Sequence, residues 1–320
     1  MMSVPWQWSS SAVQSAQSVV SRMSYFYQGT PTNFGADTGL EVTGSTESPC
    51  QHAIAPLDVY SALGTWLCSA QWGSEESAPR MGERVVTVIE NHPSCPLDLL
   101  EQSLAMVSLE VVRPYYGDTL PSCDDVGDGL IVLGGYQSAI SDDDCPWLPK
   151  VRALLRDCVD ASIPTLGICL GAQLLALACG GSVNIDADAG LEGGVAEIRW
   201  LPEANLDELF GRIAVCCNPM RSPSMHFDVV ETLPASATLL GSSAMYPNQI
   251  FRIGRRAWGL QCHPEASFGT FRAWATDAAT QESMSPSSFL RAYQDREPEI
   301  VATAHMVGRS FARVVGCSGR

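Results

Sequence analysis

The sequence predicts an α/β fold with an open, mostly parallel sheet flanked by helices and a smaller antiparallel set of strands. Between residues 84 and 179, short continuous apolar segments alternate with helical patterns. Strands that are buried on both faces and alternate with helices indicate a parallel sheet with right-handed crossovers. After Gly180-Gly181 the apolar segments become shorter and follow one another more closely, which is typical of antiparallel strands. Ligands of such a sheet are expected beyond the carboxyl ends of its parallel strands.

The first half of the pattern supplies the parallel strands and their covering helices. Residues 84–90 (RVVTVIE) form a compact apolar segment, and residues 147–161 carry Leu148, Val151, Leu154 and Cys158 on one helical side. We expect strands at 84–90, 109–113, 129–133 and 164–168, and helices at 97–106, 147–161 and 170–179.

The second half is predicted to close the sheet and then to become helical. We expect further strands at 195–201, 226–230, 238–242, 250–253 and 257–261. Helices are expected at 271–279, 287–295 and 299–315. The sequence contains no evident internal repeat.

Composition divides the chain into three parts. Residues 1–80 are rich in Ser, Thr, Gly, Gln and Pro and show no sustained period, so we predict a low-complexity, mostly disordered extension. Residues 81–270 are expected to form the functional domain. Residues 271–320 are expected to be a helical tail packed on it.

Charge and cysteine content narrow the classes of function. The chain has 19 basic against 35 acidic residues, which argues against a nucleic-acid or membrane partner. It shows no secretion signal and no apolar run of membrane-spanning length, so a cytoplasmic protein is expected. The 12 cysteines include no C-x-x-C pair, so we expect reduced thiols, no metal site and no cofactor.

The segment from Ile163 to Gln173 (IPTLGICLGAQ) carries the strongest chemical signal. An apolar strand turns at Cys169 into an apolar helix, with Gly167 and Gly171 flanking the cysteine as glycines flank the serine of a nucleophile elbow. Such a tight turn needs small neighbours, and a helix N-terminus favours thiolate over thiol. Cys169 is therefore the candidate nucleophile, although a buried structural cysteine would also fit these residues taken alone.

A nucleophilic cysteine needs a base and a group that orients the base. Of the five histidines, His263 follows an apolar strand and precedes Pro264-Glu265. Because residues i and i+2 of an extended chain point to one side, Glu265 can hold the imidazole of His263. The competing pair is His226 with Asp228, which has the same spacing but a less clear place at a strand end.

A pair of glycines after the strand at 129–133 supplies the third element. Gly134-Gly135 lets a backbone N–H face a reacting carbonyl group without side-chain obstruction. Together with the N–H of Leu170, the N–H of Gly135 would form an oxyanion hole. These elements predict an acyl-transfer site.

Taken together, Gly-Gly after a strand, G-I-C-L-G-A-Q and a downstream H-P-E resemble the class I, triad-type glutamine amidotransferases, whose fold is flavodoxin-like. The resemblance covers residues 83–270. It implies Cys169 as nucleophile, His263 as base, Glu265 as its orienting group, and Gly135 and Leu170 as oxyanion donors. It also implies that Gly134 and Gln173 contact the substrate.

Two further features refine the resemblance. Residues 246–251 and the helical tail are similar to free-standing members that resemble the glutaminase part of GMP synthase. The chain departs from the family pattern at Tyr136, where proline is usual, at Cys262, where an aromatic residue is usual, and at Ala266, where a β-branched residue is common. The first two departures bear on the substrate pocket, and none removes a catalytic group.

Three functions follow from these expectations. The leading one is a glutaminase that converts glutamine to glutamate through a Cys-thioester and delivers ammonia to a separate synthetase, because no ATP-binding motif occurs in this chain. The alternative is a stand-alone γ-glutamyl hydrolase acting on γ-glutamyl amides or peptides. Its relatives often carry arginine after the nucleophile, where this chain has Leu170. A non-catalytic regulatory protein of the same fold is the third. The acceptor of the ammonia and the oligomeric state are left open.

Overall fold

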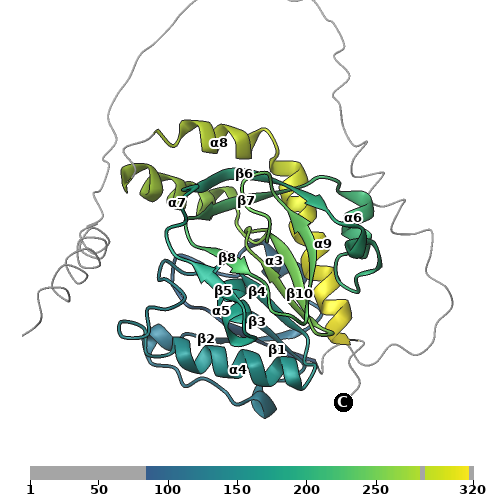
Figure 1. Cartoon of the computed structure of the whole chain (residues 1–320). Coiled ribbons are helices and arrows are strands. Elements are labelled where there is room, and N and C mark those ends of the chain that lie inside the picture. The colour runs from purple at the N-terminus through teal and green to yellow at the C-terminus, as the bar shows by residue number, and fades with distance from the viewer. Residues whose placement is uncertain (1–83, 282–284, 317–320) are drawn as a thin grey trace, which may run out of the picture. The chain divides into compact units, whose positions relative to one another are not determined.

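A nine-stranded sheet with the order β2-β1-β3-β4-β11-β10-β9-β6-β7 runs through the structure, a computed structural model that describes residues 84–281 and 285–316 (Figure 1). Five neighbouring strands are parallel, and the remaining four continue the sheet in antiparallel order. The parallel strands are β2 (Ser108–Val112), β1 (Val85–Ile89), β3 (Gly129–Val132), β4 (Thr165–Ile168) and β11 (Ala257–Leu260). The predicted fold class is confirmed.

Alternation along the parallel strands builds two apolar layers, one on each face of the sheet. In β3, Ile131 joins one layer while Leu130 and Val132 join the other. This alternation explains why the strands read as continuous apolar runs. The first layer packs against α3 (Leu99–Ser103), α6 (Gly211–Cys216) and α9 (Glu297–Gly316), and the second packs against α4 (Leu148–Asp160) and α5 (Leu170–Ala178).

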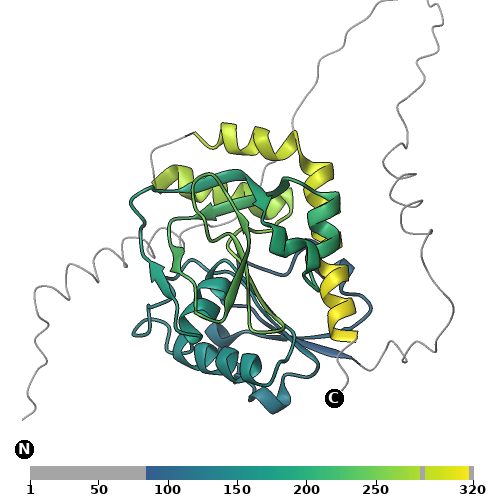
Figure 2. The ribbon, with the colours of Figure 1, turned by 45° about the vertical axis from the view of Figure 1, so that its right-hand side comes forward.

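The antiparallel part extends the sheet from β11. Its strands are β10 (Ile250–Ile253), β9 (Ala237–Ser242), β6 (Glu192–Trp200) and β7 (Met220–His226). A separate pair is formed by β5 (Ser182–Asn184) and β8 (Val229–Thr232). Helices α7 (Phe268–Gln281) and α8 (Ser287–Gln294) lie next to each other at the top of Figure 2. They carry a third apolar cluster, against which Val195 of β6 and Met225 of β7 pack. Short 3-10 helices occur at Pro114–Tyr116, Cys123–Asp125 and Pro202–Leu206.

The predicted elements of the parallel half all occur, but one later strand was wrong. The strand expected at 226–230 is two strands, because His226 ends β7 and Val229 begins β8. The turn between them is held from outside, since the N–H of Ala187 donates to the carbonyl of Phe227 at 3.2 Å. The sequence pattern also missed α6, β5 and most of β7, whose polar residues and Pro223 hide its strand character.

Residues 1–80 lie outside the described residues, so the predicted extension and the predicted domain boundaries stay predictions. Within the described residues, no helix is long and apolar enough to cross a membrane.

Candidate active site

Cys169 lies on a strained turn between β4 and α5. Its φ is +50° and its ψ −106°, which is unusual for a residue with a side chain. The glycines on either side are required by close packing. A Cβ atom at Gly171 would lie 2.0 Å from the carbonyl oxygen of Val132, and one at Gly167 would lie 2.5 Å from that of Gly171. The spacing that predicted the elbow is therefore a steric requirement of the turn.

His263 and Glu265 follow the carboxyl end of β11, which is the strand next to β4. The Nδ1 atom of His263 and Oε1 of Glu265 are 2.6 Å apart, and the two residues are 3% and 1% exposed. The backbone N–H of His263 donates to the carbonyl of Pro223 at 2.8 Å. The carbonyl of Glu265 accepts from the N–H of Leu99 at 2.9 Å. The positions of His263 and Glu265 are thus fixed both by the contact between their side chains and by backbone hydrogen bonds to neighbouring segments.

The electrostatics of the site favour a protonated imidazole. Burial lowers the pKa of His263, but the negative charges of Glu265 and Cys169 and hydrogen bonds to both raise it to about 10. Cys169 and His263 both lie close to Gly134. A Cβ atom at Gly134 would lie 3.7 Å from Cβ of Cys169 and 3.2 Å from Cε1 of His263. The structure therefore brings Cys169, His263, Glu265 and Gly134 together.

Gly135 and Leu170 are also neighbours. A Cβ atom at Gly135 would lie 2.9 Å from Cδ2 of Leu170. Within the described residues, neither of their backbone N–H groups donates a hydrogen bond to another protein group. Two such free donors beside a cysteine are what an oxyanion hole requires.

Gln173 lies one turn into α5 and is 2% exposed. Its side-chain N–H donates to the carbonyl oxygen of Asp228 at 2.9 Å, so it ties α5 to the turn between β7 and β8. Contact between Gln173 and a substrate stays a prediction.

The competing pair does not form. The side chain of Asp228 accepts from the backbone N–H of Asp186 at 2.9 Å. His226 instead pairs with Glu192, its partner in the β6–β7 register, with 3.0 Å between Nε2 and Oε2. Glu192 also accepts from Ser243 and Gln249 at 2.5 and 2.6 Å. His226 thus belongs to a buried polar network that joins the ends of four strands, β6, β7, β9 and β10.

Three residues near the nucleophile were not predicted from the sequence. The ring of Trp274, on α7, lies 4.6 Å from the ring of His263, and its Nε1–H donates to the carbonyl of Ser94 at 2.8 Å. Gln261 places its amide nitrogen 3.8 Å from Sγ of Cys169. It precedes His263 by two residues, a strand spacing that could have revealed it.

Cys95 is the third missed residue, and it follows the β1 strand by a short turn. A Cβ atom at Gly134 would lie 3.8 Å from Cβ of Cys95. Burial, followed by the negative charges of Cys169 and Glu265, raises the pKa of the Cys95 thiol well above its ordinary value. Cys95 is therefore a neutral thiol that borders the site.

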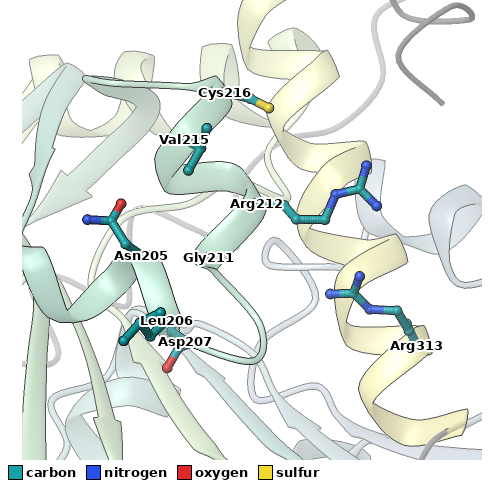
Figure 3. Close-up of a pocket in the computed structure, with 8 residues that line it drawn as sticks. All are labelled: Asn205, Leu206, Asp207, Gly211, Arg212, Val215, Cys216 and Arg313. Atoms are coloured by element: carbon teal, nitrogen blue, oxygen red, sulfur yellow. The ribbon is translucent and has the colours of Figure 1, made fainter. Parts of the chain in front are cut away.

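A groove of about 420 Å³ lies elsewhere, between the 3-10 helix at Pro202–Leu206, α6 and α9 (Figure 3). Arg313, one of its lining residues, donates to the carbonyl of Glu208, whose side chain pairs with Arg256 just before β11. The groove is thus at the amino ends of the parallel strands, whereas Cys169 follows a carboxyl end. None of the predicted site residues lines it.

The fold and the site together define an α/β protein with a cysteine at a strand–helix elbow beside a buried imidazole–carboxylate pair. The sequence model of the glutamine amidotransferase class-I family matches residues 96–277. The chain belongs to this family.

Curated relatives match part of the chain. It is 34% identical to gamma-glutamyl peptidase 5 of Arabidopsis thaliana over 43% of this chain and 53% of that protein. It is 35% identical to the glutamine amidotransferase-like protein YfeJ of Salmonella typhimurium over 48% of this chain and 63% of the relative. A GMP synthase of Thiobacillus denitrificans is 33% identical over 43% of this chain and 25% of its own length. The chain thus spans only about half to three-fifths of the first relatives.

Solved structures share the fold over a larger part of the chain. A glutamine amidotransferase from Thermotoga maritima aligns with a TM-score of 0.63 and 24% identity over 74% of this chain and 99% of its own. A glutamine amidotransferase from Methylobacillus flagellatus aligns with a TM-score of 0.62 and 26% identity over 72% of this chain and 94% of its own.

Proposed function

We propose that the chain hydrolyses γ-glutamyl amides through a thioester on Cys169, with His263 and Glu265 as the other two members of a catalytic triad. The leading substrate is glutamine, with ammonia passing to a separate synthetase. The observation that carries the proposal is the 2.6 Å His263–Glu265 contact beside a cysteine whose backbone is held at φ +50°. A paired base and a strained nucleophile are typical of acyl transfer rather than of a structural core.

The geometry supports a two-step reaction. The thiolate of Cys169 attacks the amide carbon, and the N–H groups of Gly135 and Leu170 stabilise the oxyanion. The imidazolium of His263 donates its proton to the departing nitrogen, which leaves as ammonia or an amine, and a γ-glutamyl thioester remains on Cys169. His263 then takes a proton from water, the resulting hydroxide attacks the thioester, and glutamate and the thiolate are released.

Glu265 supports both steps through His263. Its charge favours the imidazolium that exists before the first proton transfer and again after the second. Its hydrogen bond to Nδ1 leaves Nε2 as the nitrogen that faces Cys169 and the leaving group.

A second substrate class has its own support. The chain is 33–34% identical to gamma-glutamyl peptidases 4 and 5 of Arabidopsis thaliana over 43% of its length. The same triad would cleave a substituted γ-glutamyl amide, because only the leaving nitrogen differs. Leu170, where many hydrolases of that kind carry arginine, is the observation against it.

The experiment combines labelling with turnover. The diazo-ketone analogue of glutamine alkylates an activated cysteine without a synthetase, so mass spectrometry should find it on Cys169. Cys169→Ala should abolish labelling and the release of ammonia from glutamine, whereas Cys216→Ala, which removes an exposed cysteine outside the site, should change neither. Labelling that persists in Cys169→Ala would refute the assignment of the nucleophile.

A further inference from the structure

The leaving group of the proposed reaction must lie beside His263, because the imidazole hands its proton to the departing nitrogen across a hydrogen bond. The residues that pack around the imidazole are therefore the candidates for contact with the leaving group. Trp274 covers one side of His263, with ring centroids 4.6 Å apart. It belongs to α7, so this helix borders the leaving-group side of the site.

Asp277 follows on the same face of α7. It lies three residues after Trp274, which on a helix places it on the same side about 4.5 Å further along the axis. The hydroxyl of Tyr136 donates to Oδ2 of Asp277 at 3.3 Å. Tyr136 directly follows Gly135, the proposed oxyanion donor, so this contact connects the loop after β3 with α7 at the edge of the site.

The hydrogen-bond partner of Asp277 is an aromatic residue and not a base. Within the described part of the chain, Asp277 forms no ion pair, and the nearby Arg272 points to the ring of Phe268 at 5.9 Å. Tyr136 is 41% exposed, and its ring lies 4.5 Å from the ring of His92. A carboxylate without a counter-ion, hydrogen-bonded to the phenol of Tyr136 and on the same helix face as Trp274, is suited to an ammonium group through charge and cation–π attraction.

Partial burial is consistent with a missing counter-ion. Desolvation raises the pKa of Asp277, and the hydrogen bond from Tyr136 offsets only part of this effect. A bound cation would supply the charge that the protein does not provide. Ammonia has a single nitrogen, which would lie beside the imidazole of His263, whereas a diamine has a second nitrogen that a carboxylate can bind.

We propose that Tyr136 and Asp277 form a leaving-group subsite that selects γ-glutamyl amides whose amine carries a second, positively charged nitrogen. The inference rests on the hydrolytic chemistry proposed above and favours the second substrate class given there, the substituted γ-glutamyl amides, over glutamine. It assigns a role to Tyr136, which directly follows Gly135 and hydrogen-bonds to α7. Trp274 would pack against the methylene chain between the two nitrogens.

Three synthetic substrates of equal chain length test the subsite. They are the γ-glutamyl amides of diaminobutane, butylamine and aminobutyrate, which end in a positive, a neutral and a negative group. We expect kcat/KM of the wild type to be about tenfold or more higher for the cationic than for the neutral substrate, and lowest for the anionic one.

Asp277→Asn should remove this order. It should lower kcat/KM for the cationic substrate about tenfold and leave the neutral substrate within about twofold. Asp157→Asn, an exposed carboxylate on α4, is the matched control and should preserve the order. Equal rates for cationic and neutral substrates in the wild type, or an equal loss of both in Asp277→Asn, would overturn the subsite.

The same experiment separates this inference from the proposed function. If the wild type cleaves none of the three amides while Cys169 is still labelled by the glutamine analogue, the substrate class is wrong and the nucleophile stands. If Cys169 is not labelled either, the hydrolytic function itself is overturned.

Discussion

The Nδ1 atom of His263 lies 2.6 Å from Oε1 of Glu265, in a place where both side chains are buried. The second carboxylate oxygen of Glu265 has no hydrogen-bond partner among the described residues. The negative charge of this carboxylate therefore has one main recipient, the imidazole. Because a buried carboxylate is costly without a compensating charge, the protonated imidazole stabilises this pair more than the neutral imidazole does.

We expect Glu265→Gln to lower kcat by about 10³-fold or more, because a neutral amide neither orients nor stabilises the imidazolium. Comparison of this variant with the wild type should also reveal how the stability that the His263–Glu265 pair provides depends on pH. The folded-state pKa of His263 is about 10, above its ordinary 6.5. Its stabilising contribution is therefore complete below about pH 6.5 and is lost as pH rises through about 10.

Urea unfolding of the wild type and of Glu265→Gln at several pH values measures this contribution. The difference in unfolding free energy should be largest near pH 6 and should shrink by about pH 10. Glu101→Gln, which changes an exposed carboxylate on α3, is the control. A difference that does not vary with pH would show that the charge of Glu265 does not act on the His263 proton.

The two buried histidines should respond differently to substitution. His263→Gln removes the proposed base and should lower kcat by about 10²–10⁴-fold. His226→Gln can still donate to Glu192, so kcat should stay within about tenfold while the unfolding free energy falls by about 1–3 kcal/mol. Steady-state assays paired with denaturant unfolding measure both effects. A loss of kcat in His226→Gln as large as in His263→Gln would reopen the choice of base.

Local signals account for the parts of the structure that the sequence predicts well. The parallel strands are buried on both faces, so each is a continuous apolar run in the sequence. The elbow can be recognised in the sequence because only glycine fits at positions 167 and 171. Contacts between side chains that are far apart in the sequence produce no such local pattern. Glu192 reaches His226 only through the β6–β7 register, and Asp277 reaches Tyr136 across 141 residues. The His226–Asp228 alternative relied on local spacing and therefore missed the partner that folding supplies.

Gly171→Ala tests the steric basis of the elbow. The added methyl group would lie 2.0 Å from the carbonyl oxygen of Val132, so β3 and α5 must separate. We expect the unfolding free energy to fall by at least about 2 kcal/mol, with loss of labelling at Cys169. Gly269→Ala makes the same change on α7, where the nearest atom would be 3.6 Å away, and it should be neutral or slightly stabilising. Equal stability of the two variants would show that the turn tolerates a side chain.

Asp207 should control stability without affecting catalysis. Its Oδ1 accepts from the N–H groups of Leu209 and Phe210 and from Nε1–H of Trp258, and its Oδ2 accepts from Arg252 at 2.7 Å. Asp207→Ala leaves the buried donors of Leu209, Phe210 and Trp258 without an acceptor and Arg252 without its partner, so the unfolding free energy should fall by about 3–5 kcal/mol. The neighbouring Glu208→Ala removes only an outer ion pair with Arg256 and should cost less than about 1 kcal/mol.

Activity measured below the unfolding transition completes this test. Asp207 lines the groove at the amino ends of the parallel strands, and Cys169 lies beyond a carboxyl end. We therefore expect kcat/KM of folded Asp207→Ala to stay within about twofold of the wild type, because Cys169, His263 and Glu265 make no hydrogen bond to this carboxylate. A drop in kcat/KM without unfolding would mean that the two ends of the sheet are coupled, and the hydrogen bond from Trp258 on β11, the strand that leads to His263, would be the connection to examine.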